Sequence, residues 1–139
     1  MKRRDFLEKA GYGAAGFAVF PMAQESGEKS PDLVVRRYDI ELEVYEVGSK
    51  TRCFKKGDTF KWPQDNGKIC TYLMSALDPV IATLSRGGIL PWKYAGTPYE
   101  KVIDPEGITT EYIRCPDPSE AGMVMKITRT FKDKRTIKG

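Results

Sequence analysis

The sequence predicts a small α+β domain, in which a mainly antiparallel sheet of about four strands carries one or two short helices on one face. Apolar and charged residues alternate with a period of two in residues 37–44, and strand-like runs recur in residues 59–62, 108–114 and 123–131. Only residues 69–77 place their apolar side chains at helical spacing. The order strand–strand–helix–strand–strand therefore predicts this fold class.

The first two predicted strands are separated by a turn. Tyr38, Ile40, Leu42 and Val44 alternate with charged residues, and the phase of the alternation changes at Tyr45, which predicts a β-bulge there. The Gly-Ser-Lys segment at 48–50 ends this strand. A Lys-Gly-Asp turn at 56–58 then leads into the short second strand, and two aromatic side chains of that strand are predicted to be buried (Phe60 and Trp62).

The helical part of the chain begins after a predicted tight turn at Asn66-Gly67. One helical face carries five apolar or aromatic side chains (Ile69, Tyr72, Leu73, Ala76 and Leu77). Asp78-Pro79 matches an N-cap followed by proline at the first helical position, so a second short helix is predicted to begin there. The glycine pair at 87–88 ends it.

The last part of the chain is predicted to be a loop followed by a hairpin. Residues 89–100 form the loop, with Trp92 and Tyr94 as its hydrophobic anchors. The hairpin strands, 108–114 and 123–131, are joined through the Cys-Pro-Asp-Pro segment at 115–118. That segment is predicted to be rigid because each proline fixes a φ angle and removes a backbone donor. Residues 132–139 are expected to form a basic tail.

The first 23 residues have the features of an export leader. A basic start precedes an uncharged run, residues 10–23, that is too short to span a membrane. Arg3, Arg4, Phe6 and Leu7 fill the positions of the twin-arginine export signal, which this segment resembles. The resemblance implies export of a folded protein by the twin-arginine machinery, to the periplasm or the outer face of the cytoplasmic membrane. Membrane contact is then expected only through the leader, if it stays uncleaved.

The leader also sets the expected boundaries of the domain. Residues 24–36 are polar at first and are expected to form a flexible linker. The folded domain is expected to cover residues 37–131, before the basic tail. It is small enough that a covalent or metal cross-link would add usefully to its stability.

Composition and charge exclude several classes of function. The formal net charge is +4, and about half of it belongs to the leader, so the domain lacks the strong basic excess of most nucleic-acid binders. The chain contains no histidine. This excludes a Ser-His-Asp triad, a Cys-His pair and any imidazole metal site. The sequence therefore predicts a partner other than nucleic acid.

Several landmarks follow one another in a definite order. A cysteine at 53 precedes Gly57-Asp58, a second cysteine at 70 opens the predicted helix, a Gly-Gly-Ile-Leu-Pro-Trp segment occupies 87–92, and Cys-Pro-Asp-Pro occupies 115–118. This order, from about Tyr38 to Arg129, resembles a family of small uncharacterised microbial domains. Most of its members lack a leader, so the export signal is a departure from the pattern. The resemblance implies no reaction, but it implies that the three cysteines belong to the domain's own pattern.

The three cysteines, Cys53, Cys70 and Cys115, are the main chemical lead. Each lies near the end of a predicted element, and no CxxC pair is present. Together they would form a soft thiolate site for Cu(I), Zn or an iron–sulfur cluster, with Asp117 or Asp58 as a fourth ligand. Alternatively, two of them form a disulfide in an oxidising compartment and the third is buried or free. Cys70 is expected at a helix start, where the helix dipole favours a thiolate.

Two classes of function follow from these residues. We favour an exported binding or accessory protein that is not an enzyme and that holds a metal or redox centre on the three thiols. The alternative is a small thiol-dependent enzyme that uses Cys115 or Cys70 as nucleophile, with Asp117 as its orienting partner. Without histidine, such a thiol must be activated by a helix terminus or a lysine. A carrier is expected to need all three cysteines, whereas an enzyme is expected to depend on one.

Overall fold

The computed structural model describes residues 30–139. The predicted leader, with Arg3, Arg4, Phe6 and Leu7, and the first residues of the predicted linker lie outside the described residues. Within residues 30–139, no helix is both long enough and apolar enough to cross a membrane.

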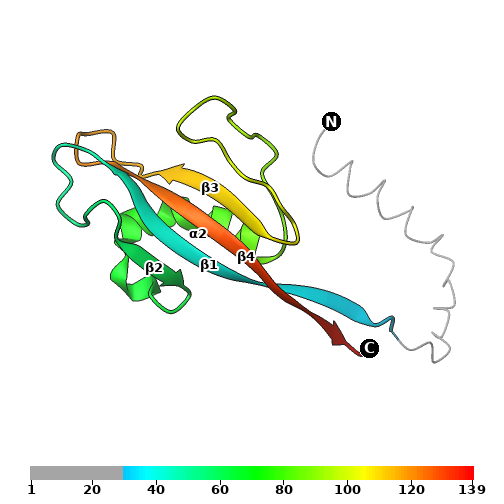
Figure 1. The fold of residues 1–139 in the computed structure, drawn as a ribbon. Helices are drawn as coiled ribbons and strands as arrows, with labels where there is room; N and C mark the ends of the chain where they lie inside the picture. The colour runs from blue at the N-terminus through cyan, green and yellow to red at the C-terminus, as the bar shows by residue number, and fades with distance from the viewer. Residues whose placement is uncertain (1–29) are drawn as a thin grey trace, which may run out of the picture. The chain divides into compact units, whose positions relative to one another are not determined.

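Four strands and one α-helix make up the domain (Figure 1). The strands are β1 (Leu33–Val47), β2 (Thr59–Trp62), β3 (Ile108–Arg114) and β4 (Met123–Ile137), and the α-helix is α2 (Thr71–Ser85). The strands form one sheet in the order β2-β1-β4-β3, and every neighbouring pair is antiparallel. This confirms the predicted α+β class and the predicted order of elements.

The two long strands, β1 and β4, pair along almost their whole length and form the centre of the sheet. The register shifts between Val44 and Glu46, which confirms the β-bulge predicted at Tyr45. A second shift lies between Arg37 and Tyr38. Strand β2 pairs only with residues 40–43, and β3 pairs only with residues 124–130. The ends of β1 and β4 therefore extend beyond both outer strands as a two-stranded ribbon (Figure 1).

This ribbon corrects the expected boundaries of the domain. Residues 33–36 were assigned to a linker and residues 132–137 to a tail, but both segments are β-strand and pair with each other. Cross-strand pairs explain the extension, because Leu33 lies opposite Ile137 and the Arg37 guanidinium forms an ion pair with Asp133. Sequence periodicity missed the pairing because the ribbon is exposed on both faces and so lacks an apolar alternation.

The core lies between one face of the sheet and helix α2. Strand β1 contributes Ile40, Leu42 and Val44, and β4 contributes three buried side chains to the same core (Met123, Met125 and Ile127). The helix buries five residues at helical spacing against them (Leu73, Met74, Leu77, Ile81 and Leu84). Phe60 and Trp62 of β2 are half-buried at the margin of this core, as predicted. Within residues 30–139, no helix packs on the opposite face of the sheet (Figure 1).

A single helix replaces the two helices that the sequence predicted. Asp78 is not an N-cap, and Pro79 lies inside α2. The apolar face continues across the proline from Leu77 to Ile81, and burial of the residues beyond it offsets the backbone hydrogen bond that proline cannot make. The tight turn expected at Asn66-Gly67 is instead the 3₁₀-helix η2 (Asn66–Lys68). Tyr72 was predicted to face the core, but its side chain is exposed.

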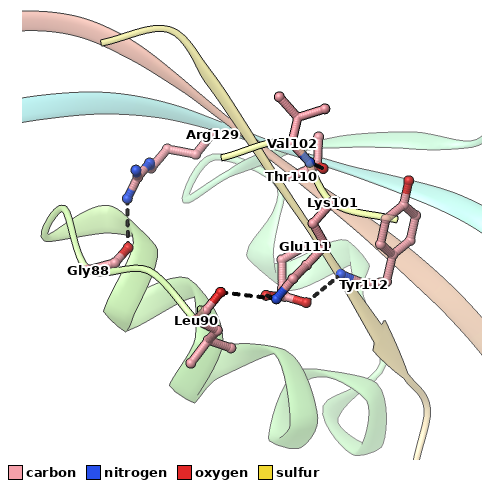
Figure 2. A network of polar contacts seen from close by, with 8 residues as sticks. All are labelled: Gly88, Leu90, Lys101, Val102, Thr110, Glu111, Tyr112 and Arg129. Atoms are coloured by element: carbon pink, nitrogen blue, oxygen red, sulfur yellow. Dashed lines mark hydrogen bonds and ion pairs between the residues drawn. The ribbon is translucent and has the colours of Figure 1, made fainter. Parts of the chain in front are cut away.

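The loop between α2 and β3, residues 86–107, carries the largest departures from expectation. Trp92 and Tyr94 were predicted to anchor this loop, but their side chains are 64% and 56% exposed. Its anchor is instead Lys101, whose ammonium group is buried and lies 2.7 Å from the Glu111 carboxylate of β3 (Figure 2). The same ammonium group donates to the backbone carbonyl of Leu90 at 3.1 Å.

Arg129 of β4 is the second buried cation. Its guanidinium group donates to the carbonyls of Leu84 and Gly88, at 3.1 and 2.7 Å, and so satisfies acceptors at the C-terminal end of α2 (Figure 2). It also lies over the ring of Tyr38, 4.4 Å from the ring centroid. Arg129 therefore links the end of the helix to the sheet, and it does so by donating to backbone carbonyls and not to a carboxylate.

Candidate functional site

Three cysteines from distant parts of the chain line one pocket of about 340 Å³, which we call the thiol pocket. Cys53 lies in the loop between β1 and β2, Cys70 precedes α2, and Cys115 follows β3. All three thiols are free. Eight other residues line the thiol pocket (Lys50, Arg52, Phe54, Tyr72, Leu73, Asp117, Ala121 and Met123).

Backbone hydrogen bonds between two loops bring Cys53 towards Cys115. The Gly48 amide donates to the Gly122 carbonyl at 3.0 Å, and the Lys50 amide donates to the Glu120 carbonyl at 3.0 Å. The Thr51 hydroxyl adds a bond to the Ala121 carbonyl at 2.9 Å. The loop after β1 is therefore fastened to the loop between β3 and β4.

This fastening depends on a glycine. A Cβ atom at Gly48 would lie 2.0 Å from the Glu120 carbonyl oxygen, well inside any permitted contact. Gly48 is thus required by the close approach of the two loops and not by its φ angle. The sequence marks Gly48 as the end of a strand, and only the structure shows which backbone it approaches.

Cys115 lies on the inner side of the thiol pocket. Its amide donates to the Met123 carbonyl at 2.8 Å, so it closes the β3–β4 hairpin ladder. Its side chain is buried and packs within the hydrophobic core. Cys53 and Cys70, by contrast, are exposed. The pocket therefore has one buried thiol and two that solvent reaches.

Cys70 is the N-cap of α2, which confirms its predicted place at a helix start. Its sulfur accepts a hydrogen bond from the Leu73 amide at 3.5 Å, in the way that an N-cap oxygen does. The positive end of the helix dipole points at this sulfur.

Asp117, the predicted fourth ligand, lines the same pocket. Its carboxylate accepts from the Ser119 amide at 2.8 Å, a turn-forming bond, and hydrogen bonding by Ser119 lowers the pKa of Asp117. Asp117 is therefore ionised at neutral pH. Asp58, the other proposed ligand, is not among the lining residues, and its carboxylate accepts from the Lys55 amide at 2.8 Å in the turn before β2.

The thiols share the pocket without forming a coordination shell. Among residues 30–139, no group of three or more Cys, Asp or Glu side chains is placed to hold a metal ion. The metal site predicted on Cys53, Cys70, Cys115 and Asp117 stays a prediction.

Two cationic residues that sequence reasoning did not single out also line the pocket. Lys50 and Arg52 lie on the loop that carries Cys53. The Lys50 ammonium group pairs loosely with Glu120, at 3.4 Å with both side chains exposed. Nearby cations favour the thiolate form of cysteine. The only signal for them in the sequence is their nearness to Cys53, which does not reveal that they face Cys70 and Cys115 as well.

Comparison of the chain with known protein families, curated proteins and solved structures finds no match. The site is therefore interpreted from its own residues.

Proposed function

We propose that this protein is an exported binding protein, not an enzyme, and that its thiol pocket takes up a soft, thiophilic metal ion such as Cu(I) or Zn(II). One observation carries the proposal. All three cysteines of the chain line a single pocket although they are far apart in sequence and come from three different connections.

The chemistry of the pocket supports a soft cation as ligand. Thiolates are the protein ligands that Cu(I), Zn and iron–sulfur clusters prefer. Asp117 adds an ionised carboxylate, and Cys70 presents its sulfur at the N-terminus of α2. Cys53 and Cys70 are exposed, so an ion can reach their thiols from solvent. Export through the twin-arginine route, which carries folded proteins, fits a protein loaded before transport.

Metal titration with thiol counting tests the proposal on the full 139-residue chain. Cu(I) and Zn(II) are each titrated in competition with a chromophoric chelator, and free thiols are counted by alkylation and mass spectrometry with and without the ion. We expect one ion per chain and protection of all three cysteines. Replacement of Cys53, Cys70 or Cys115 by serine, one at a time, is expected to weaken binding in each case.

A pair of aspartate variants separates a ligand from a turn residue. Asp117→Ala is expected to weaken metal binding. Asp104→Ala is the matched control, because Asp104 also accepts a turn-forming bond, from the Glu106 amide at 3.1 Å, but lies outside the thiol pocket. Absence of stoichiometric metal, or a mass two protons lighter that reveals a disulfide, would contradict the proposal.

The second candidate function is a thiol-dependent enzyme, and the N-cap position of Cys70 favours it. In that case Cys70 or Cys115 acts as nucleophile with Asp117 beside it, and Lys50 helps to hold the thiolate. Alkylation kinetics distinguish the two functions. A nucleophile is expected to react much faster than the other two cysteines in the metal-free protein, whereas carrier thiols are expected to react at rates that follow their exposure.

A further inference from the structure

A second pocket lies on the face of the sheet opposite α2. Its volume is about 170 Å³, and it is lined by Tyr94, Tyr99, Tyr112, Arg114 and Val124. We call it the tyrosine pocket. Successive side chains of a strand alternate between faces, so Arg114 and Val124 point away from α2, whereas Cys115 and Met123 next to them belong to the core and the thiol pocket. The two pockets thus lie on opposite faces of the β3–β4 hairpin.

Two of the lining tyrosines, Tyr99 and Tyr112, are held in place by each other and by Tyr45, which does not line the pocket itself. The ring of Tyr45 lies 4.9 Å from that of Tyr112 and 6.2 Å from that of Tyr99, and the rings of Tyr99 and Tyr112 are 5.8 Å apart. The Tyr45 hydroxyl donates to the Pro98 carbonyl at 2.7 Å. These contacts fix the ring planes and leave little side-chain freedom to lose on binding.

Polar groups around the rings are few and well placed. The Tyr99 hydroxyl donates to the Glu46 carboxylate at 2.6 Å, and the exposed guanidinium group of Arg114 reaches the same hydroxyl only at 3.4 Å. Within residues 30–139, the Tyr112 hydroxyl has no hydrogen-bond partner. Partial burial raises the pKa of Tyr112, so this hydroxyl remains a donor at neutral pH. Donors and acceptors are therefore both available beside the aromatic surface.

Tyr94 presents its ring in an unusual way. Its φ angle is 51°, in the left-handed region that bulky residues rarely adopt, and its carbonyl accepts two bonds from Thr97 that hold this turn. The ring stays 56% exposed at the edge of the pocket. Burial does not explain this placement, since an exposed aromatic ring gains little from folding.

We propose that the tyrosine pocket binds a neutral sugar ring, such as one pyranose unit of an oligosaccharide. Its volume is below the ~300 Å³ of pockets that enclose whole ligands, so it suits one ring of a longer, otherwise exposed molecule. Tyrosine faces stack on the apolar face of a sugar, while the lining residues Arg114 and Tyr112 offer donors to its hydroxyl groups. On this side of the sheet the charges of Arg114 and Lys126 are balanced by the carboxylates of Glu43 and Glu46, which suits a neutral ligand.

Binding of three neutral oligosaccharides tests this inference on the full chain. Maltohexaose, cellohexaose and chitohexaose are titrated by calorimetry and by saturation-transfer NMR. We expect saturable binding of at least one of them. The variants Tyr94→Ala and Arg114→Gln, which remove exposed side chains and leave the fold intact by circular dichroism, are each expected to weaken that binding about tenfold.

Matched variants make the test specific to this pocket. Tyr72→Ala removes an equally exposed tyrosine on the helix side of the sheet and is expected to leave sugar binding unchanged. Tyr112→Phe keeps the ring and removes only the hydroxyl, so it is expected to weaken binding less than Tyr94→Ala does. Three results would each overturn the inference: no saturable binding of any of the three sugars at millimolar concentration, binding that Tyr94→Ala leaves unchanged, or displacement of the bound sugar by adenosine at lower concentration. Metal loading of the thiol pocket has no part in these outcomes, so the two proposals fail independently.

Discussion

The buried ion pair between Lys101 and Glu111 gives the sharpest test of how this fold is held together. The Nζ–Oε2 distance is 2.7 Å, and the two side chains are only 1% and 5% exposed. Replacement of Lys101 by methionine keeps most of the side-chain volume but removes the charge. It leaves the Glu111 carboxylate buried with one remaining donor, the Tyr112 amide at 3.0 Å. Loss of one member of a buried pair costs about 3–5 kcal/mol.

This loss is large for a domain of this size, because native proteins are stable by only about 5–15 kcal/mol. Urea unfolding followed by circular dichroism measures it as a fall in the free energy of unfolding. Lys50→Met is the matched control, since Lys50 pairs with Glu120 at 3.4 Å while both side chains are exposed, and such a pair contributes about 0–1 kcal/mol.

A double variant shows whether the cost arises from the unpaired charge. Lys101→Met combined with Glu111→Leu places two apolar side chains in the same space, and such replacements are often neutral or stabilising. We therefore expect the double variant to regain most of the stability that Lys101→Met loses. A loss below about 1 kcal/mol in Lys101→Met, the size expected of an exposed pair, would refute the reasoning.

Two further predictions concern loop packing and pH. Gly48→Ala is expected to destabilise the protein by about 1–3 kcal/mol, because its Cβ atom would lie 2.0 Å from the Glu120 carbonyl oxygen. Urea unfolding measures this loss. Gly67→Ala is the control and should change the stability little, because a Cβ atom at Gly67 meets no atom within 4 Å. Asp133 is an ionised acceptor at neutral pH, and hydrogen bonding from Arg37 lowers its pKa below the ordinary 3.8. The ion pair of Asp133 with Arg37 therefore stabilises the protein fully above pH 3.8, and this contribution is lost as the pH falls through the lowered pKa. Asp133→Asn should accordingly reduce the loss of stability that acid causes, measured in a pH series. An acid branch as steep in Asp133→Asn as in the unchanged protein would contradict this assignment.

Local patterns in the sequence predicted most of the secondary structure. The alternation from Tyr38 to Val44 predicted β1, and its change of phase predicted the bulge at Tyr45. Cys70 was correctly expected at a helix start. These features depend on neighbouring residues, so they can be recognised without knowledge of the rest of the chain.

Patterns failed where tertiary contacts outweighed local preference. Pro79 predicted a helix start, but burial of the apolar face on both sides of it extends one helix from Thr71 to Ser85. Glu111 and Arg129 lie on strand faces that turn out to be buried, and nothing in their own neighbourhood identifies their partners. Charged residues at such positions are normally taken as solvent-facing. Glu111 is stabilised in the interior by the ammonium group of Lys101, and Arg129 by the carbonyls at the end of α2.

The candidate sites likewise depend partly on local sequence and partly on tertiary contacts. The sequence by itself determined the fold class, the order of the elements, the absence of histidine chemistry and the three cysteines as candidates. The tertiary structure alone decided that Cys53, Cys70 and Cys115 share a pocket, and that tyrosines gather on the opposite face of the sheet. The physical reason is that strand and helix periods are local properties of the chain, whereas the meeting of loops far apart in sequence depends on the register of β1 with β4 and on the close approach of Gly48 to Glu120.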